Sequence, residues 1–503
     1  MLSRFLLPAE NLEVTSEARA TRVRIAPSPT GALHLGTART ALYNYLYARK
    51  NGGAFIFRLE DTDNERSNEK YTEDIIEGLK WLGITWDEGP DIGGPYPPYR
   101  QTEKIDHYES MANKLLASGF AYLCYATPDE LASMKEEQKA KNESIRYDNR
   151  YRNLSQDEKE KFEKEGRIPS IRFRIEEPQK IKWHDAIKGQ IEVSSSDLGG
   201  DMIIVKSNGV ATYNFAVVID DIDMQMSLVL RGEDHIHNTA KQLLIFEALG
   251  ETPPHYGHTA LMFDTEKRKL SKRRHGESVH IAKYREDGYM PEALVNYLAQ
   301  MSWTPENGKE IFTLEEACQW FDIKKVSKSP AVFDIDKLNW FNAHYIRSLP
   351  IETVVERAMP YLADFDLSSY SQDSIKDMIE LLRESLVKLA DIKDSAAFFF
   401  GDTVPVEQEV KDSVLTAAEA KTVLEALRAN ISKIPFTDPK GAKAVVDELG
   451  KELGLKGKNL YWPVRVALSG KTQGPDLGSI ICILGEKRVA CRLEAALGLC
   501  KTT

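Results

Sequence analysis

The first half of the chain alternates short apolar runs with segments of helical periodicity. Runs typical of buried strands occupy residues 23–25, 54–59, 201–206, 213–221 and 227–234. Apolar residues recur at helical spacing in 36–50, 71–82 and 238–250. Strands that alternate with helices predict an α/β fold with a doubly wound parallel sheet, formed by two segments of the chain.

A region of different character separates these two segments. Its first part is charged and typical of helices, whereas 170–175 and 190–195 alternate like half-exposed strands. We therefore expect an inserted α+β domain over 104–200. It divides a Rossmann-type domain into a first half, 21–103, and a second half, 201–285.

The strand pattern stops at about residue 290, and a purely helical pattern replaces it. Helical spacing is clear in 373–392, 413–431, 441–454 and 478–497. These segments predict an all-helical domain over 348–503, with 286–347 as the region before it. Residues 1–20 do not continue the core pattern, and we expect them to form an N-terminal extension.

Composition places the chain among soluble globular proteins. Its 503 residues are enough for several domains, and 42% are hydrophobic and 28% charged. No run approaches the roughly 18 apolar residues of a membrane span. A net charge of −11 argues against a protein that coats nucleic acid wholesale, but a local basic surface remains compatible with RNA binding.

Two further features favour a cytoplasmic protein. The five cysteines are scattered and include no Cys-x-x-Cys pair, as is typical of a reducing compartment. Glu10, Glu13 and Glu17 argue against an organellar transit peptide, which should lack acidic residues.

The stretch RIAPSPTGALHLGT, residues 24–37, has the layout strand, tight turn, helix. Pro27 and Pro29 keep the backbone extended after the strand. His34 then lies at the N-terminus of the next helix, where free N–H groups and the helix dipole favour an anion. Gly36 lets the backbone approach a phosphate closely. By itself, however, a His before Gly is more often an ordinary turn residue.

The stretch KRKLSKRRH, residues 267–275, is strongly basic. Taken alone it is most simply a solvated loop. It follows a strand–helix unit of the second half-sheet, however, and Lys269 and Lys272 are suited to act as mobile charges on a phosphate chain. Together with the turn at His34, it supplies the donors and neutralising charge that phosphate chemistry requires.

These motifs resemble those of the class I aminoacyl-tRNA synthetases. HLGT at 34–37 is similar to that class's HIGH signature, and KLSKR at 269–273 to its KMSKS signature. FRLEDTDNERS (57–67), TYNFAVVIDD (212–221) and LRGEDHIHNT (230–239) follow the order of the bacterial-type glutamyl-tRNA synthetases. The sequence is therefore identified as a member of that family.

The resemblance implies a glutamate–tRNA ligase that acts in the cytoplasm, and we expect a monomer. Its substrates would be L-glutamate, ATP with bound Mg²⁺ and tRNA-Glu. The insert at 104–200 would bind the acceptor stem, 286–347 would contact the stem, and 348–503 would bind the anticodon.

The resemblance also assigns site residues. The catalytic residues would be His34, Lys269 and Lys272. The ATP-binding residues would be His34, Gly36, Thr37, Lys269, Lys272 and Arg273. The glutamate-binding residues would be Arg24, Ser28, Glu60, Tyr213 and Arg231.

Elementary chemistry supports the assigned glutamate pocket. Glutamate needs guanidinium groups for its carboxylates and an acid for its ammonium group. Arg24 and Arg231 supply the former and Glu60 the latter. For Arg231 alone, a salt bridge with Glu233 or Asp234 would be the simpler interpretation.

The sequence departs from the family pattern in three places. Many relatives have Asn or Cys where Val217 stands, so no carboxylate contact carries over there. Some relatives bind zinc in the inserted domain, but here Cys124 stands alone, and we predict no zinc. Arg274 is an extra residue in the lysine loop.

Several alternatives stay open at this point. The enzyme could also charge tRNA-Gln, because Ser385 stands near the position where strictly discriminating relatives place an Arg. A glutaminyl-tRNA synthetase would carry a β-barrel anticodon region. A glutamyl-queuosine enzyme would lack an anticodon domain, a nucleotidylyltransferase would need neither insert nor helical domain, and a non-catalytic relative should have lost His34 or the lysine loop.

Overall fold

The computed structural model describes residues 20–62 and 67–500, so residues 1–19 of the predicted extension lie outside it. The chain divides into two compact units. The first runs to Arg285 and resumes over Pro291–Ile335, and the second comprises Glu286–Met290 and the residues from Asp336 onward. Every described strand belongs to the first unit, and the second is helical. The predicted class, an α/β domain followed by a helical one, is confirmed.

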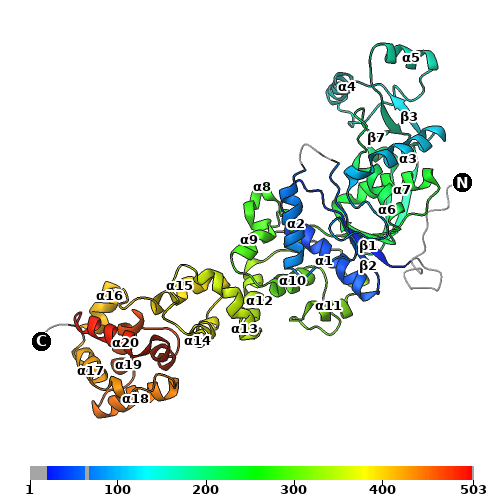
Figure 1. The fold of residues 1–503 in the computed structure, drawn as a ribbon. Coiled ribbons are helices and arrows are strands. Elements are labelled where there is room, and N and C mark those ends of the chain that lie inside the picture. The colour runs from blue at the N-terminus through cyan, green and yellow to red at the C-terminus, as the bar shows by residue number, and fades with distance from the viewer. Residues whose placement is uncertain (1–19, 63–66, 501–503) are drawn as a thin grey trace. The chain divides into compact units, whose positions relative to one another are not determined.

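The strands are short and appear as arrows in Figure 1. They are β1 (Arg22–Ile25), β2 (Ala54–Phe57), β3 (Ala121–Cys124), β4 (Ser170–Phe173), β5 (Lys180–Asp185), β6 (Gly189–Ser194), β7 (Met202–Val205), β8 (Leu228–Gly232), β9 (His255–Thr259), β10 (Met262–Phe263) and β11 (Ala331–Val332).

The helices of the first unit surround these strands. They are α1 (Leu35–Lys50), α2 (Glu69–Trp81), α3 (Ile105–Ala117), α4 (Pro128–Ala140), α5 (Gln156–Lys164), α6 (Tyr213–Asp223), α7 (Ile236–Leu249), α8 (Lys272–His275), α9 (Ile281–Glu286), α10 (Pro291–Gln300) and α11 (Leu314–Trp320).

The second unit contains the remaining helices. They are α12 (Ile335–Ser348), whose first residue belongs to the first unit, α13 (Ile351–Ala358), α14 (Gln372–Arg383), α15 (Ile392–Ala396), α16 (Gln408–Val410), α17 (Ala418–Ala429), α18 (Pro439–Glu452), α19 (Lys458–Ser469) and α20 (Leu477–Leu497).

The parallel strands come from both halves of the sequence, as predicted. β1 pairs with β2, and β8 pairs with β9, in parallel. The two pairs meet where the Ser227 N–H donates to the Arg22 carbonyl at 2.9 Å. The first residues after β1 and the last residue of β8 therefore lie at the same end of neighbouring strands, which is where α/β proteins bind ligands.

Helix α1 covers this junction of the two halves. It contacts β1, β2 and β8, and its buried residues include Leu35, Leu42 and Leu46. The Asn44 side chain donates to the Leu230 carbonyl of β8 at 2.9 Å. The helix that begins after His34 is therefore fixed to the strand that carries Arg231.

The inserted region contributes to two different sheets. β3, β4 and β7 form an antiparallel sheet, so 201–206, predicted for the parallel sheet, pairs elsewhere. β5, which the strand pattern missed, forms a hairpin with β6 and pairs in parallel with β9 at Asp185 and Tyr256. Strand partners are set by long-range packing, which local periodicity does not report.

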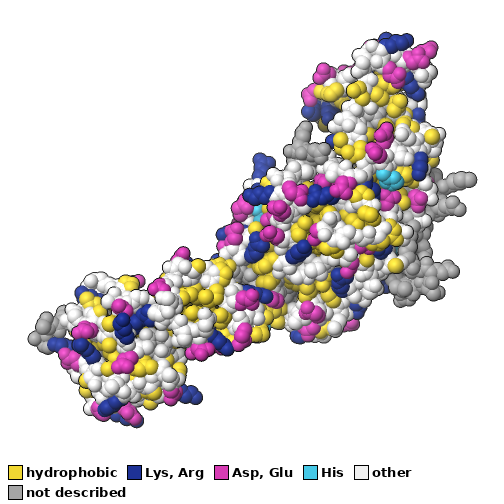
Figure 2. Space-filling model, in the orientation of Figure 1, with side chains coloured by type: hydrophobic (Ala, Val, Ile, Leu, Met, Phe, Trp, Pro, Cys, Tyr) yellow, Lys and Arg dark blue, Asp and Glu magenta, His cyan; other side chains and the backbone are white. Residues whose placement is uncertain are grey.

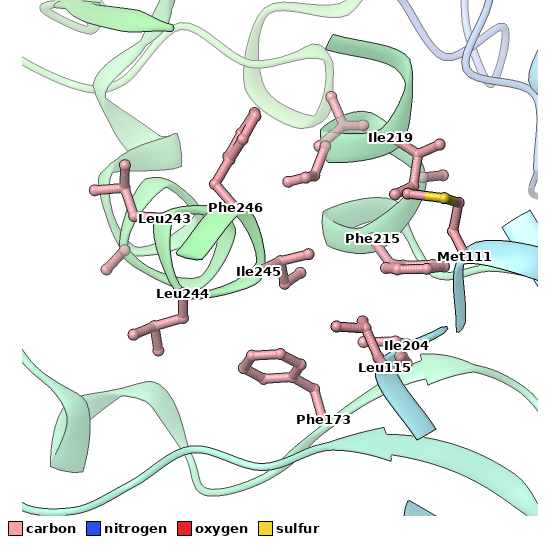
Figure 3. Close-up of a cluster of buried hydrophobic side chains, with 14 of the residues drawn as sticks. Met111, Leu115, Phe173, Ile204, Phe215, Ile219, Leu243, Leu244, Ile245 and Phe246 are labelled. Atoms are coloured by element: carbon pink, nitrogen blue, oxygen red, sulfur yellow. The ribbon is translucent and has the colours of Figure 1, made fainter. Parts of the chain in front are cut away.

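The prediction of a strand at 213–221 is wrong, because these residues form helix α6. Its buried residues run consecutively from Phe215 to Asp221. Apart from the two aspartates at its end this run is apolar, and by periodicity alone it looks the same as a buried strand. Figure 3 shows Phe215 and Ile219 of α6 packed among side chains of α3, β4, β7 and α7.

Helix α14 is shorter than its spacing predicts. It ends at Arg383, although Leu386 and Leu389 are also buried. The Ser385 N–H and hydroxyl both donate to the Leu382 carbonyl and close the helix. The two-residue strand β11 is likewise an exception to the predicted absence of strands beyond 290.

The surface carries charges of both signs. Figure 2 shows Lys and Arg side chains interspersed with Asp and Glu over the face that it draws. None of the helices described for this chain combines the length and the hydropathy that crossing a bilayer requires.

Candidate functional site

The turn after β1 leads directly into the N-terminus of α1, where the helix dipole favours an anion. His34 is the N-cap residue of α1, and its Nδ1 accepts from the Gly36 and Thr37 N–H groups at 3.1 and 3.3 Å. Because Nδ1 accepts two hydrogen bonds, the ring proton is assigned to Nε2, which lies 3.1 Å from Thr37 Oγ1. The exposed Nε2–H group can donate to an anion.

The surroundings of His34 favour its neutral form. Partial desolvation by the cleft walls lowers the pKa of His34 below its ordinary value, and the neighbouring His280 and Lys269 lower it further, against an opposing effect of Asp234. At neutral pH the ring is therefore a hydrogen-bond donor without a full charge, as its capping role requires.

The basic loop approaches the same cleft from the second half-sheet. Lys269 lies before α8, Lys272 is its first residue, and both side chains are exposed. Lys269 Nζ lies 3.7 Å from Asp234 Oδ2. At the base of the loop, Asp264 accepts from Arg268 and His275 at 2.8 and 3.0 Å, so the two lysines extend from an anchored turn.

One cleft of about 600 Å³ brings the predicted site residues together. Its walls come from the turn after β1, the end of β2, α6, β8 and the basic loop. The predicted residues that line it are Arg24, Ser28, His34, Gly36, Thr37, Glu60, Tyr213, Arg231, Lys269 and Lys272. Arg273 is exposed on α8 and does not line the cleft.

The two arginines differ in their partners. Arg24 is 4% exposed, and its Nε donates to Asp221 at 3.3 Å. Arg231 is 5% exposed, but its hydrogen bonds go to the neutral groups of Thr239 and Gln242, each at 2.7 Å. No carboxylate of the described residues pairs with Arg231, so the alternative salt bridge with Glu233 or Asp234 does not form.

A buried guanidinium that has no carboxylate partner destabilises the folded protein unless a ligand supplies the negative charge. Arg231 Nε is buried without any hydrogen-bond partner in the described structure. Its Nη1 donates to Tyr213 Oη at 3.3 Å. The chemistry of Arg231 therefore fits an anionic ligand, and a carboxylate matches its planar donors.

Glu60 provides the opposite charge at the end of β2. It is 5% exposed and accepts from Arg58 Nη2 at 3.0 Å. Burial raises the pKa of Glu60, although Arg58 and Arg24 oppose that rise. A buried carboxylate in this cleft is suited to bind an ammonium group, which would restore its charged form.

Tyr213 and Ser28 occupy different depths of the cleft. Tyr213 begins α6, and its hydroxyl lies 3.1 Å from His235 Nδ1. Ser28 is exposed at the rim. Val217 is fully buried in the hydrophobic core and does not line the cleft. Its side chain therefore makes no contact to a substrate carboxylate in the cleft.

The predicted site residues do not include the buried residues that hold this pocket. Arg58 Nη1 donates to Asp221 at 2.8 Å, so one guanidinium connects Asp221, the partner of Arg24, with Glu60. Arg58 and Asp221 are almost fully buried. A charged residue inside an otherwise apolar run was the available signal, because such residues are buried only when they are paired.

The described residues include no group of three His, Cys, Asp or Glu side chains that could hold a metal ion. Cys124, in the insert, instead accepts a hydrogen bond from Arg172 Nε at 3.2 Å and lies 3.4 Å from Tyr147 Oη. It is part of a buried aromatic cluster with Tyr122, Tyr125, Met134, Tyr147 and Tyr151.

Known protein families and relatives match almost the whole length of the chain. The profile of the class I tRNA synthetase (E and Q) catalytic domain matches residues 20–340, and that of an anticodon-binding domain matches 353–497. The glutamate–tRNA ligase of Carboxydothermus hydrogenoformans is 44% identical over 477 residues, which cover 94% of this chain and 98% of that protein. The glutamate–tRNA ligase of Bacillus subtilis is 45% identical over 478 residues, 94% of this chain and 99% of that protein.

A solved structure shows the same fold. The crystal structure of a glutamate tRNA ligase from Elizabethkingia meningosepticum, in complex with its amino acid, superimposes with a TM-score of 0.88. It is 34% identical in sequence, and the match covers 95% of this chain and 99% of that one.

Proposed function

Since the chain belongs to the glutamate–tRNA ligase family of the class I aminoacyl-tRNA synthetases, we propose how the residues of its cleft divide the reaction. The enzyme attaches L-glutamate to tRNA-Glu for protein synthesis. The glutamate α-carboxylate attacks the α-phosphate of ATP and forms glutamyl-adenylate and pyrophosphate. The 2′-OH of the terminal adenosine of the tRNA then attacks the carbonyl of the adenylate, which forms the glutamyl ester and releases AMP.

His34, Lys269 and Lys272 would act on the ATP phosphates. Neutral His34 donates from Nε2, and the two lysines neutralise the charge that moves to pyrophosphate. Gly36 and Thr37 line the cleft at the N-terminus of α1, where the helix dipole favours an anion. Mg²⁺ would arrive with ATP as part of the substrate, because the phosphate oxygens of ATP are ligands that it prefers.

The glutamate carboxylates would be bound by Arg24, Arg231 and Tyr213. Glu60 would bind the ammonium group, and Ser28 would contact the substrate at the rim of the cleft. The observation that carries this assignment is the absence of a carboxylate partner for the buried Arg231 within the described chain. Glutamine would leave this guanidinium poorly paired, and pockets built on such contacts reject the wrong ligand by about 10⁴-fold.

The test is aminoacylation of tRNA-Glu at varied glutamate with Arg24→Ala and Arg24→Lys variants. Both should raise the KM for glutamate and leave that for ATP nearly unchanged. Lys should not rescue, because a point charge does not reproduce a planar fork. Wild-type glutamate kinetics in Arg24→Ala, or equal charging of glutamine and glutamate by the parent enzyme, would refute the pocket assignment.

We further propose that 104–200 binds the acceptor stem, 286–347 contacts the stem and 348–503 binds the anticodon, in a cytoplasmic monomer. The anticodon-binding profile over 353–497 supports the last of these roles. It also favours this function over a glutamyl-queuosine enzyme or a nucleotidylyltransferase.

A relaxed choice of tRNA is a second candidate at the anticodon end. Ser385 is exposed beyond the C-terminus of α14, and its hydroxyl bonds to its own helix. It offers no guanidinium to an anticodon base. Charging purified tRNA-Glu and tRNA-Gln transcripts in parallel tests this: comparable rates support relaxed specificity, and exclusive charging of tRNA-Glu excludes it.

A further inference from the structure

A chain of buried hydrogen bonds begins at Nη2 of Arg231. Arg231 Nη2 donates to Thr239 Oγ1 and to Gln242 Oε1. Both hydrogens of Nη2 are thereby occupied, which fixes the plane of the guanidinium. Thr239 Oγ1 in turn lies 3.0 Å from His258 Nε2, closer than its other acceptor, the His235 carbonyl at 3.3 Å.

The direction of these hydrogen bonds follows from Asp185, whose carboxylate is only an acceptor. His258 Nδ1 lies 2.5 Å from Asp185 Oδ2 and therefore carries the ring proton. Burial lowers the pKa of His258 below its ordinary value, so the ring is neutral and Nε2 is an acceptor. His258 Nε2 thus accepts from the Thr239 hydroxyl, which itself accepts from Arg231. Thr239, His258 and Asp185 are all fully buried, so water does not compete for these bonds.

Asp185 ends strand β5 and organises the tip of the β5–β6 hairpin. Its Oδ1 accepts from the N–H groups of Ile187 and Lys188 at 3.0 and 2.8 Å, and from the His258 N–H at 3.1 Å. One carboxylate thus holds both the hairpin turn and strand β9.

The same hairpin tip also supports a second wall of the cleft. Lys188 Nζ lies 2.5 Å from Glu233 Oε2, and Glu233 Oε1 accepts from the Leu261 N–H at 2.8 Å. Leu261 lines the cleft. The hairpin therefore touches the supports of two walls of the site without lining it itself.

We propose that Asp185, His258 and Thr239 are positioning residues that orient Arg231 for the substrate carboxylate, and that the β5–β6 hairpin thereby sets the affinity of the glutamate pocket. This rests on the proposed role of Arg231. Because the hairpin lies within the segment assigned to acceptor-stem binding, it also gives that segment a direct mechanical connection to amino-acid recognition.

The test compares Thr239→Val with Thr239→Ser, because valine keeps the shape of threonine and loses the hydroxyl, whereas serine keeps it. We expect Thr239→Val to raise the KM for glutamate by about 10- to 100-fold, as for a lost bond to a charged group. The KM for ATP and kcat should stay near the parent values, and Thr239→Ser should stay within roughly threefold of the parent. Equal effects of Val and Ser, or equal rises in both KM values, would overturn the proposal.

Two further variants make the result specific. Arg231→Ala tests the proposed function alone, because an unchanged KM for glutamate in this variant would refute the pocket assignment. If Arg231→Ala raises the KM for glutamate but Thr239→Val leaves it unchanged, only the positioning role of the hydrogen-bond chain is refuted. Asp185→Asn should raise the KM for glutamate, and adding Thr239→Val should cause less than the additive effect. If Asp185→Asn does not fold, the Thr239 pair decides.

Discussion

The imidazole of His34 serves the helix and the cleft at the same time. Nδ1 closes the N-terminus of α1, and this leaves Nε2–H for the ligand. The signature HLGT predicted an anion site at this position. It did not reveal that the ring caps its own helix, because the tautomer depends on the turn geometry and not on the order of residues.

Substitutions at His34 can separate these two roles. His34→Asn keeps a capping acceptor and lacks the Nε2 donor, so it should lower single-turnover adenylate formation by ~10²-fold and leave the melting temperature unchanged. His34→Ala should show the same rate loss and also lose about 1 kcal/mol of stability. Parent-like rates in either variant would contradict the donor role. Lys272→Ala should lower the rate without an effect on stability.

His235 predicts a pH dependence of stability. Burial and the nearby Arg231 lower the pKa of His235 to about 4, below the roughly 6.5 of an unfolded chain. The unfolded state therefore binds the proton more readily, and this contribution to stability is lost as pH falls from 6.5 towards 4. Melting curves at pH 7 and pH 5 should show a smaller acid-induced loss for His235→Gln than for the parent. His237→Gln, at the exposed neighbour, is the matched control and should behave like the parent.

At the scale of elements, α6 and the β5–β6 hairpin are parts of the fold that the hydrophobic pattern of the sequence did not predict. The pattern correctly predicted β1, α1, α2 and α7 and the convergence of two chain segments on one cleft. It assigned α6 to a strand, since burial on every face removes periodicity. It also missed β5 and the sheet to which β7 belongs, because those depend on contacts between residues far apart in sequence.

A buried ion network joins β2, α6 and α3 around Arg58. Its Nη1 and Nη2 donate to Asp221 and Glu60, and Nε lies 3.6 Å from Asp220. Lys104, just before α3, pairs with Asp220 at 2.7 Å. The three elements are thus held by charges that water does not reach.

Removal of Arg58 should destabilise the fold strongly. Arg58→Met leaves buried Glu60 without its ion-pair partner and removes one of the cations that pair with Asp220 and Asp221, so we expect a loss of about 3–5 kcal/mol in urea unfolding. Arg150→Met is the control, because Arg150 pairs with Asp148 at the surface and should cost about 0–1 kcal/mol. A loss for Arg58→Met no greater than for the control would show that the network does not hold these elements together.

At the scale of the whole molecule, the two compact units bury separate cores. The first unit buries its core between strands and helices, and the second buries helix faces such as Ile375, Met378 and Leu382 of α14. Apolar periodicity is a strong signal in such amphipathic helices, so the helical class of the second unit was readable from the sequence.

The inserted region predicts an enzyme that needs no zinc. Cys124 contacts Arg172 and Tyr147 within an aromatic cluster, where a tetrahedral site would need further Cys or His ligands. We expect elemental analysis to find no stoichiometric zinc, and a zinc chelator to change neither the melting curve nor charging with Mg²⁺ in excess. One zinc per chain, or a chelator-induced loss of stability, would contradict this.

One sheet combines β5 and β6 of the inserted region with β8 and β9 of the second half-domain. This restricts how segments of this enzyme could be exchanged with those of a relative. The hairpin β5–β6 lies between β4 and β7 in sequence, yet it pairs with β9 and not with either of them. A chimera that exchanged one continuous block from α3 to β7 would also replace β5 and β6, two strands of the recipient's four-stranded sheet β6-β5-β9-β8, with those of the donor. The unit that can be exchanged is therefore discontinuous: it comprises the chain from α3 to β4 together with β7, with crossover points on both sides of a hairpin that stays with the recipient.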